Sequence, residues 1–179
     1  MYPFMRNFTK PAKTFLFISV LSGVLWLGSY LLKIFLLYYL FQERDFALKT
    51  YLNDQNLHAV LSSFLPLFAS PLILFSVFLL FFILFLITSK ISLKENGWLF
   101  ISSILIFITC PFEIYLMTID FKIFGLINSG SFVPAEIIQL IIKRFSIFSS
   151  FPIIEVACYI AAVFLFLFQP FKKVQKNEN

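Results

Sequence analysis

Four long hydrophobic stretches divide this sequence. They cover approximately residues 14–41, 61–88, 98–118 and 147–168. Each is long enough to cross a bilayer, because a spanning helix needs about 20 mostly apolar residues. A spanning segment must also satisfy its own backbone hydrogen bonds, which favours helices. The sequence therefore predicts an all-α integral membrane protein, an antiparallel bundle of four transmembrane helices that forms a single domain over residues 1–179.

The composition agrees with a chain whose main solvent is lipid. Hydrophobic residues make up 60% of the sequence and charged residues 13%, about half the charged fraction of an ordinary soluble domain. The net charge of +5 does not indicate a nucleic-acid partner, because the basic residues flank the apolar stretches and form no mixed basic and aromatic patch. The lipid bilayer is the partner that this pattern predicts.

The first stretch has a rival interpretation as a signal peptide, because Arg6, Lys10 and Lys13 precede it. Its apolar run is much longer than that of a signal peptide, and no small-residue cleavage site follows it. We therefore expect this stretch to remain as an uncleaved membrane anchor.

The distribution of lysine and arginine predicts the orientation. The two terminal tails and the loop between the second and third stretches hold eight basic residues: Arg6, Lys10, Lys13, Lys90, Lys94, Lys172, Lys173 and Lys176. The other two loops hold five: Arg44, Lys49, Lys122, Lys143 and Arg144. Cytoplasmic loops carry the excess of basic residues. We therefore predict that both termini are cytoplasmic (N-in/C-in) in a cell membrane of the bacterial cytoplasmic type.

A short amphipathic helix is predicted at residues 134–146, in the loop before the fourth stretch. Ser131 or Pro134 suits a helix start, Glu136 falls in the first turn, and Lys143 and Arg144 fall near the end. Its apolar face would hold Ile137, Ile138, Ile141, Phe145 and Phe148. Such a helix lies on the outer surface or forms a lid across the bundle. The alternative is an early start of the fourth spanning helix.

Charged residues inside the predicted spans form the candidate site. Glu113 and Glu155 lie at similar depths below the outer ends of the third and fourth stretches, and Lys33 lies in the same half of the first stretch. Charges in this position are costly in lipid, so they usually face a bundle interior and find partners. Helical spacing places further polar side chains on the same stripes. The predicted intramembrane polar cluster is Lys33, Cys110, Glu113, Glu155, Cys158 and Tyr159.

Three interpretations of this cluster remain open. The segments CPFE at 110–113 and EVAC at 155–158 have mirrored order on antiparallel helices, which would suit a mixed thiolate and carboxylate metal site. A proton or cation site on the two carboxylates is another interpretation. The third is a structural polar cluster or a set of hydrated residues near the outer interface. We predict no bound metal and no cofactor.

No catalytic motif is present, since the sequence lacks GxSxG, HExxH, a glycine-rich phosphate loop and a paired CxxC. We therefore predict a non-catalytic protein, an accessory or assembly subunit of a larger inner-membrane complex. Its partners would be other membrane subunits or further copies of itself. One alternative is a small proton- or cation-coupled transporter or channel that uses Glu113 and Glu155. A second alternative is a lipid-handling protein whose outer pocket is capped by residues 134–148.

Overall fold

The computed structural model describes residues 8–42, 46–53 and 55–171. Arg6, Arg44, Lys172, Lys173 and Lys176, which contribute to the predicted orientation, lie outside these ranges. The described residues form six helices: α1 (Lys10–Tyr38), α2 (Leu57–Ser63), α3 (Leu65–Ser89), α4 (Gly97–Ser129), α5 (Pro134–Ser146) and α6 (Phe151–Phe168). Four segments are long and apolar enough to cross a membrane: α1, α2 with α3, α4, and α6. The all-helical class and the presence of four such helices are therefore confirmed.

The helix bounds differ from the limits of the predicted stretches. The second stretch begins as α2 at Leu57, and Phe64 separates α2 from α3. The largest difference is at α4, which runs to Ser129 and not to residue 118. Polar residues end the apolar stretch there, but they do not end the helix. Asp120 is buried on one face and Lys122 is exposed on the other, so α4 continues as an amphipathic helix.

Local signals explain where several helices begin and end. Thr9 accepts a hydrogen bond from the backbone N–H of Ala12, 3.3 Å away, and so caps the start of α1. Gly130 ends α4 in the left-handed conformation with φ of 72°, which a residue without Cβ adopts at little cost. Two prolines lie inside helices, Pro71 in α3 and Pro111 in α4. Each removes one backbone hydrogen bond from the middle of its helix.

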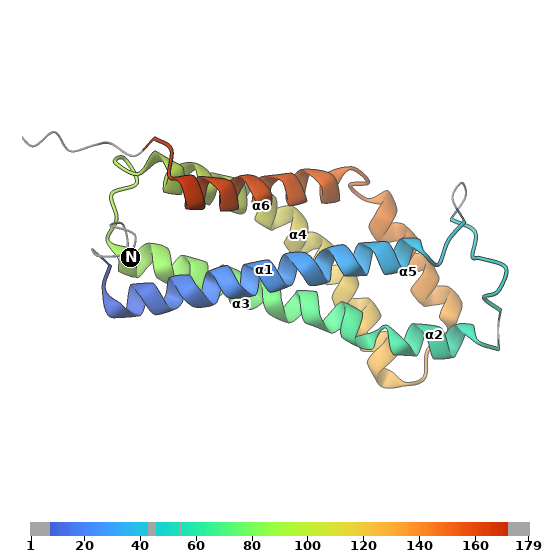
Figure 1. The fold of residues 1–179 in the computed structure, drawn as a ribbon. Helices are drawn as coiled ribbons and strands as arrows, with labels where there is room; N and C mark the ends of the chain where they lie inside the picture. Colours follow the sequence, from blue (N-terminus) through green and yellow to red (C-terminus); the bar gives the residue numbers. More distant parts are fainter. Residues whose placement is uncertain (1–7, 43–45, 54, 172–179) are drawn as a thin grey trace, which may run out of the picture.

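The long helices form two pairs. Helix α1 packs along α3, α6 packs against α4, and contacts between α3 and α4 join the pairs (Figure 1). One end of the molecule, here called the proximal end, holds the first residues of α1 and α4 and the last residues of α3 and α6 (Figure 1). The opposite end, the distal end, holds α2 and α5. Because α5 contacts both α4 and α2, it closes the distal end.

Helix α5 covers the residues for which a short amphipathic helix was predicted, and it is separate from α6. Glu136 lies in its first turn, and Lys143 and Arg144 lie in its last turn. Ile147 is extended and Phe148 has a positive φ of 57°, so the chain turns between the two helices. An early start of the fourth helix is therefore wrong. Most of the predicted apolar face is buried: Ile137, Ile138, Ile141 and Phe145.

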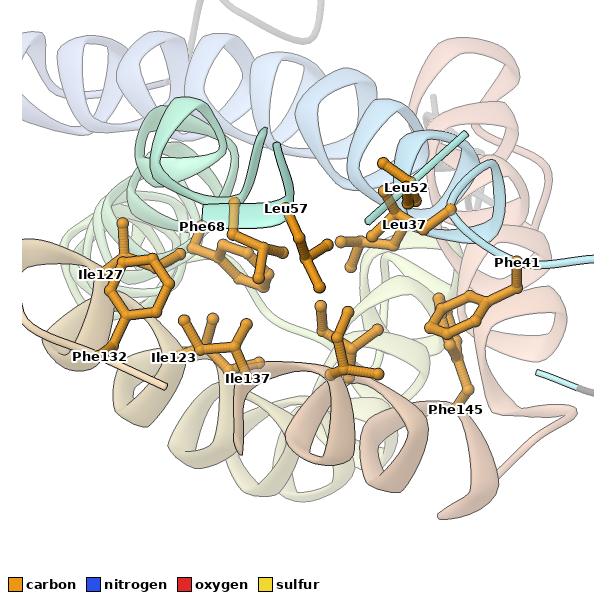
Figure 2. Packing of buried hydrophobic residues seen from close by; sticks show 14 of the residues in the cluster. Leu37, Phe41, Leu52, Leu57, Phe68, Ile123, Ile127, Phe132, Ile137 and Phe145 are labelled. Atoms are coloured by element: carbon orange, nitrogen blue, oxygen red, sulfur yellow. The ribbon is translucent and has the colours of Figure 1, made fainter. Parts of the chain in front are cut away.

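Two hydrophobic cores follow one another along the length of the molecule. The proximal core lies between the long helices and includes Leu16, Trp26, Phe75, Phe85 and Trp98. The distal core joins residues of α1 to α5, among them Leu37, Leu57, Phe68, Ile123 and Ile137 (Figure 2). Neither core contains the buried charged residues, which come from α1, α4, α5 and α6. These charged residues form the candidate site.

Candidate functional site

An ion-paired triad ties three helices together. The Asp120 carboxylate in α4 accepts a hydrogen bond from Lys33 Nζ in α1 at 2.5 Å, and another from Arg144 Nε in α5 at 2.7 Å. All three residues are at most 2% exposed. Charge-assisted hydrogen bonds of this length are the strong ones in proteins. The triad therefore fixes α1 and α5 against the same position of α4.

The register of the helices explains why Lys33 meets Asp120. Helices α1 and α4 both start at the proximal end, and 23 residues separate Lys33 from Lys10 and likewise Asp120 from Gly97. At 1.5 Å per residue, both side chains lie about 35 Å along their helices. Because the two helices run in the same direction from the same end, equal distances along them bring the opposite charges to one level.

Arg144 is held as a cation by this arrangement. Burial alone would lower the pKa of the guanidinium, but the Asp120 carboxylate more than offsets this, and the net effect is a pKa above the usual value. The aromatic ring of Tyr30 adds to the site, with its centroid 5.7 Å from Arg144 Cζ and 5.3 Å from Lys33 Nζ. Both cations therefore contact one carboxylate and lie close to one aromatic face.

A pair of glutamates lies next to the triad. Glu113 of α4 is 1% exposed and Glu155 of α6 is 0% exposed. Glu155 interacts electrostatically with Glu113, Tyr30 and Arg144, and Glu113 interacts with Lys33 and Arg144. None of the four carboxylate oxygens has a partner in hydrogen-bond geometry among the described residues. The structure thus brings two buried acids together, with the hydroxyl group of Tyr30 close to Glu155.

Aromatic side chains form the proximal wall of the glutamate pair. Trp26 and Tyr159 have ring centroids 4.5 Å apart, and Trp26 also packs on Tyr30 at 5.3 Å. The hydroxyl group of Tyr30 lies close to Glu155, and that of Tyr159 lies close to Thr109. Tyr159 interacts electrostatically with Glu155. The glutamates are therefore surrounded by hydroxyl groups as well as by cations.

The two cysteines lie near the same acids but do not form a metal site with them. Cys110 is buried, Cys158 is half-buried, and both are free thiols. Cys110 interacts with Glu113 and Glu155, and Cys158 with Glu155. Among the described residues, no group of three or more His, Cys, Asp or Glu side chains is arranged to hold a metal ion. The mixed thiolate and carboxylate metal site is therefore not supported.

The sequence prediction missed two members of this cluster. The predicted cluster does not include Asp120, and the sequence pattern places Arg144 among the charges of an outer loop. Arg144 lies seven residues after Ile137 and three after Ile141, both buried on the inner face of α5. This helical spacing is the signal that would have placed Arg144 on the buried face.

Comparison with models of protein families, with curated proteins and with solved structures finds no match to this chain.

Proposed function

We propose that the chain spans a bilayer four times with its proximal end in the cytoplasm. Lys10, Lys13, Lys90 and Lys94 lie at the proximal end. Arg144, one of the five basic residues counted in the outer loops, is buried and paired with Asp120, so it does not act as a free loop charge. The excess of basic residues on the proximal side supports the N-in/C-in orientation.

This orientation gives the charged residues two depths. Glu113 lies 16 residues after Gly97, and Glu155 lies 13 residues before Phe168, which is about 20–24 Å from the proximal ends of these helices. The hydrocarbon core is about 30 Å thick. The glutamates therefore lie within the bilayer, whereas the triad of Lys33, Asp120 and Arg144 lies near its outer surface, where α5 contributes Arg144.

Within this frame, we infer a non-catalytic accessory or assembly subunit of a larger membrane complex. The observation that supports it is the complete burial of the charged cluster. All five charged side chains are at most 2% exposed: Lys33, Glu113, Asp120, Arg144 and Glu155. Buried charges that connect four helices are suited to fixing their arrangement. Such a cluster offers no open surface on which a water-soluble substrate would react.

Helix α6 is the surface that we assign to a partner. It packs mainly against α4, and its buried residues form one stripe: Phe151, Glu155, Tyr159 and Ala162. Bulky apolar side chains cover its other faces, including Ile153 at 76% and Ile160 at 57% exposure. In lipid, helices associate by van der Waals packing of complementary faces and not by a hydrophobic force. A partner helix on this side would complete the packing of α6.

The test is extraction of tagged protein from its native membrane in mild detergent, followed by native mass measurement and identification of bound polypeptides. We expect a complex with other chains. Ile160→Trp on α6 should reduce its recovery, while Leu21→Trp, an exposed position on α1, should not. Recovery of the chain alone, or only with copies of itself, would contradict the subunit proposal.

A second candidate is a small proton-coupled transporter, and the charge balance of the cluster favours it. Lys33 and Arg144 supply two positive charges, whereas Asp120, Glu113 and Glu155 supply three negative charges when ionised. An unbalanced buried charge is costly. One proton shared by Glu113 and Glu155 would balance the cluster, and its release would unbalance it.

This candidate predicts proton flux in reconstituted vesicles that enclose a pH-sensitive dye. Glu113→Gln and Glu155→Gln should each reduce the flux to that of protein-free vesicles, while Glu95→Gln, at an exposed position, should keep it. Thermal unfolding of each variant separates lost transport from lost folding. Unchanged flux in both folded glutamine variants would eliminate the transporter.

The third possibility placed a lipid pocket under residues 134–148. Helix α5 instead packs directly on the distal core, where Ile137 and Ile141 are 0% exposed. We therefore do not propose a lipid-handling function for this end of the molecule.

A further inference from the structure

An apolar groove lies in the proximal half, between α1 and α6. Its volume is about 200 Å³. Val20 and Val24 of α1 form one rim and Val163 of α6 forms the other, and all three are more than 40% exposed. Phe82 of α3 and Ile106 of α4 form the buried floor. The groove is therefore open on the side that faces lipid.

The size of the groove restricts its occupant. On α1 its lining extends from Leu16 to Leu27, about 16 Å along the helix. This length matches one leaflet of a hydrocarbon core about 30 Å thick. A single acyl chain of that leaflet suits this length.

Positive charge lies at the proximal mouth of the groove. Lys13 is three residues before Leu16 and seven before Val20, so it follows the groove face of α1. Lys10 lies one turn earlier, at the start of the helix. Lys90 caps the end of α3, whose residues form part of the floor. Basic clusters at this level of a membrane attract anionic lipid headgroups.

We propose that the groove between α1 and α6 binds one anionic phospholipid of the proximal leaflet. One acyl chain lies along the groove, and the phosphate lies near Lys13. This site rests on the proposed membrane embedding of the chain. In the proximal half of the molecule the groove separates α1 from α6, and the bound acyl chain would contact both helices there.

The two tryptophans of the chain are natural reporters for this site. Trp26 packs against Tyr159, with ring centroids 4.5 Å apart, and Tyr159 lines the groove. Trp98 packs against Phe166, another lining residue, at 5.5 Å. Both tryptophans are 0% exposed, so bulk lipid does not touch them. An acyl chain in the groove comes within one side chain of each indole.

The experiment uses the full chain reconstituted in zwitterionic phospholipid with a small fraction of lipid that carries brominated acyl chains. Bromine quenches tryptophan fluorescence at short range. Brominated phosphatidylglycerol should quench several-fold more than the same fraction of brominated phosphatidylcholine. Val24→Phe, which fills the groove, should remove this difference, and Leu25→Phe, an exposed neighbour outside the lining, should retain it. Lys13→Gln should reduce the preference for the anionic lipid.

The outcomes separate this proposal from the membrane embedding on which it rests. Equal quenching by both headgroups, or equal behaviour of Val24→Phe and Leu25→Phe, overturns the lipid site and leaves the embedding intact. Absence of quenching even when all the lipid is brominated also overturns the lipid site, whereas failure of the chain to float with the vesicles overturns both. Circular dichroism and thermal unfolding of each variant show that the helices are still folded when quenching is compared.

Discussion

Asp120→Asn is the sharpest test of the charged triad. Asparagine keeps the shape of the side chain and one acceptor oxygen, but it removes the charge that Lys33 and Arg144 share. Both cations then lie in a site where they are at most 2% exposed. The change therefore tests charge pairing with little change in packing.

The expected cost follows from the burial of the triad. Breaking a buried ion pair by removing one partner costs about 3–5 kcal/mol. Glu113 also interacts with Lys33 and Arg144, so part of the lost negative charge is replaced. We therefore expect the lower end, about 3 kcal/mol, which corresponds to a fall in melting temperature of about 6–12 °C for a chain of this size.

Thermal unfolding in detergent micelles with a thiol-reactive fluorescent dye measures this effect. Cys110 is buried and reports on unfolding when the half-buried Cys158 is replaced by serine. Glu95→Gln removes an exposed carboxylate and should change the free energy of unfolding by less than about 0.5 kcal/mol.

A double variant separates charge from packing. Lys33→Met in the Asp120→Asn background removes one of the two unpaired cations, so it should recover part of the lost stability. If Asp120→Asn unfolds at the temperature of Glu95→Gln, the triad does not stabilise the fold and the reasoning is refuted. The same holds if the double variant loses the sum of the two single effects.

Two further matched pairs follow from the packing. Arg144→Met should increase hydrogen exchange in α5 by about 10–100-fold, because a charge-assisted hydrogen bond contributes about 1.5–3 kcal/mol. Lys143→Met, at an exposed neighbouring position, should have little effect. Equal exchange in the two variants would show that Asp120 does not hold α5. Gly23→Ala should lower the melting temperature, because a Cβ there would lie 2.9 Å from the packed ring of Phe78 and overpacking costs about 1–3 kcal/mol. Gly28→Ala meets open space and should stabilise α1 by about 0.5–1 kcal/mol, so the opposite order of melting temperatures would contradict the packing of α1 on α3.

The sequence predicted the helices well because hydrophobicity and helix signals are local properties. The apolar runs give four helices of spanning length, and the pattern from Pro134 to Arg144 gives a separate α5. The prediction ended the third helix too early. Apolar composition marks where lipid contact ends, whereas backbone hydrogen bonding continues to Gly130.

The sequence indicated only some of the residues of the candidate site. Glu113, Glu155 and Lys33 stand out because a charge within an apolar run is costly and needs a reason. Arg144 lies in a polar segment after the third stretch, where a charge has no such cost and looks like an ordinary loop residue. Its partner Asp120 lies 24 residues away in the chain, and helical periodicity places neither residue against the other.

The sequence by itself determined that this chain forms helices suited to lipid, and which of their faces carry polar side chains. Both follow from the chemistry of each residue and its neighbours within a few turns. The tertiary structure decided which of those faces meet. It pairs Asp120 with Lys33 and Arg144 and places Glu113 beside Glu155. Charge pairing across helices depends on their relative register and crossing, and these arise only when the two cores pack.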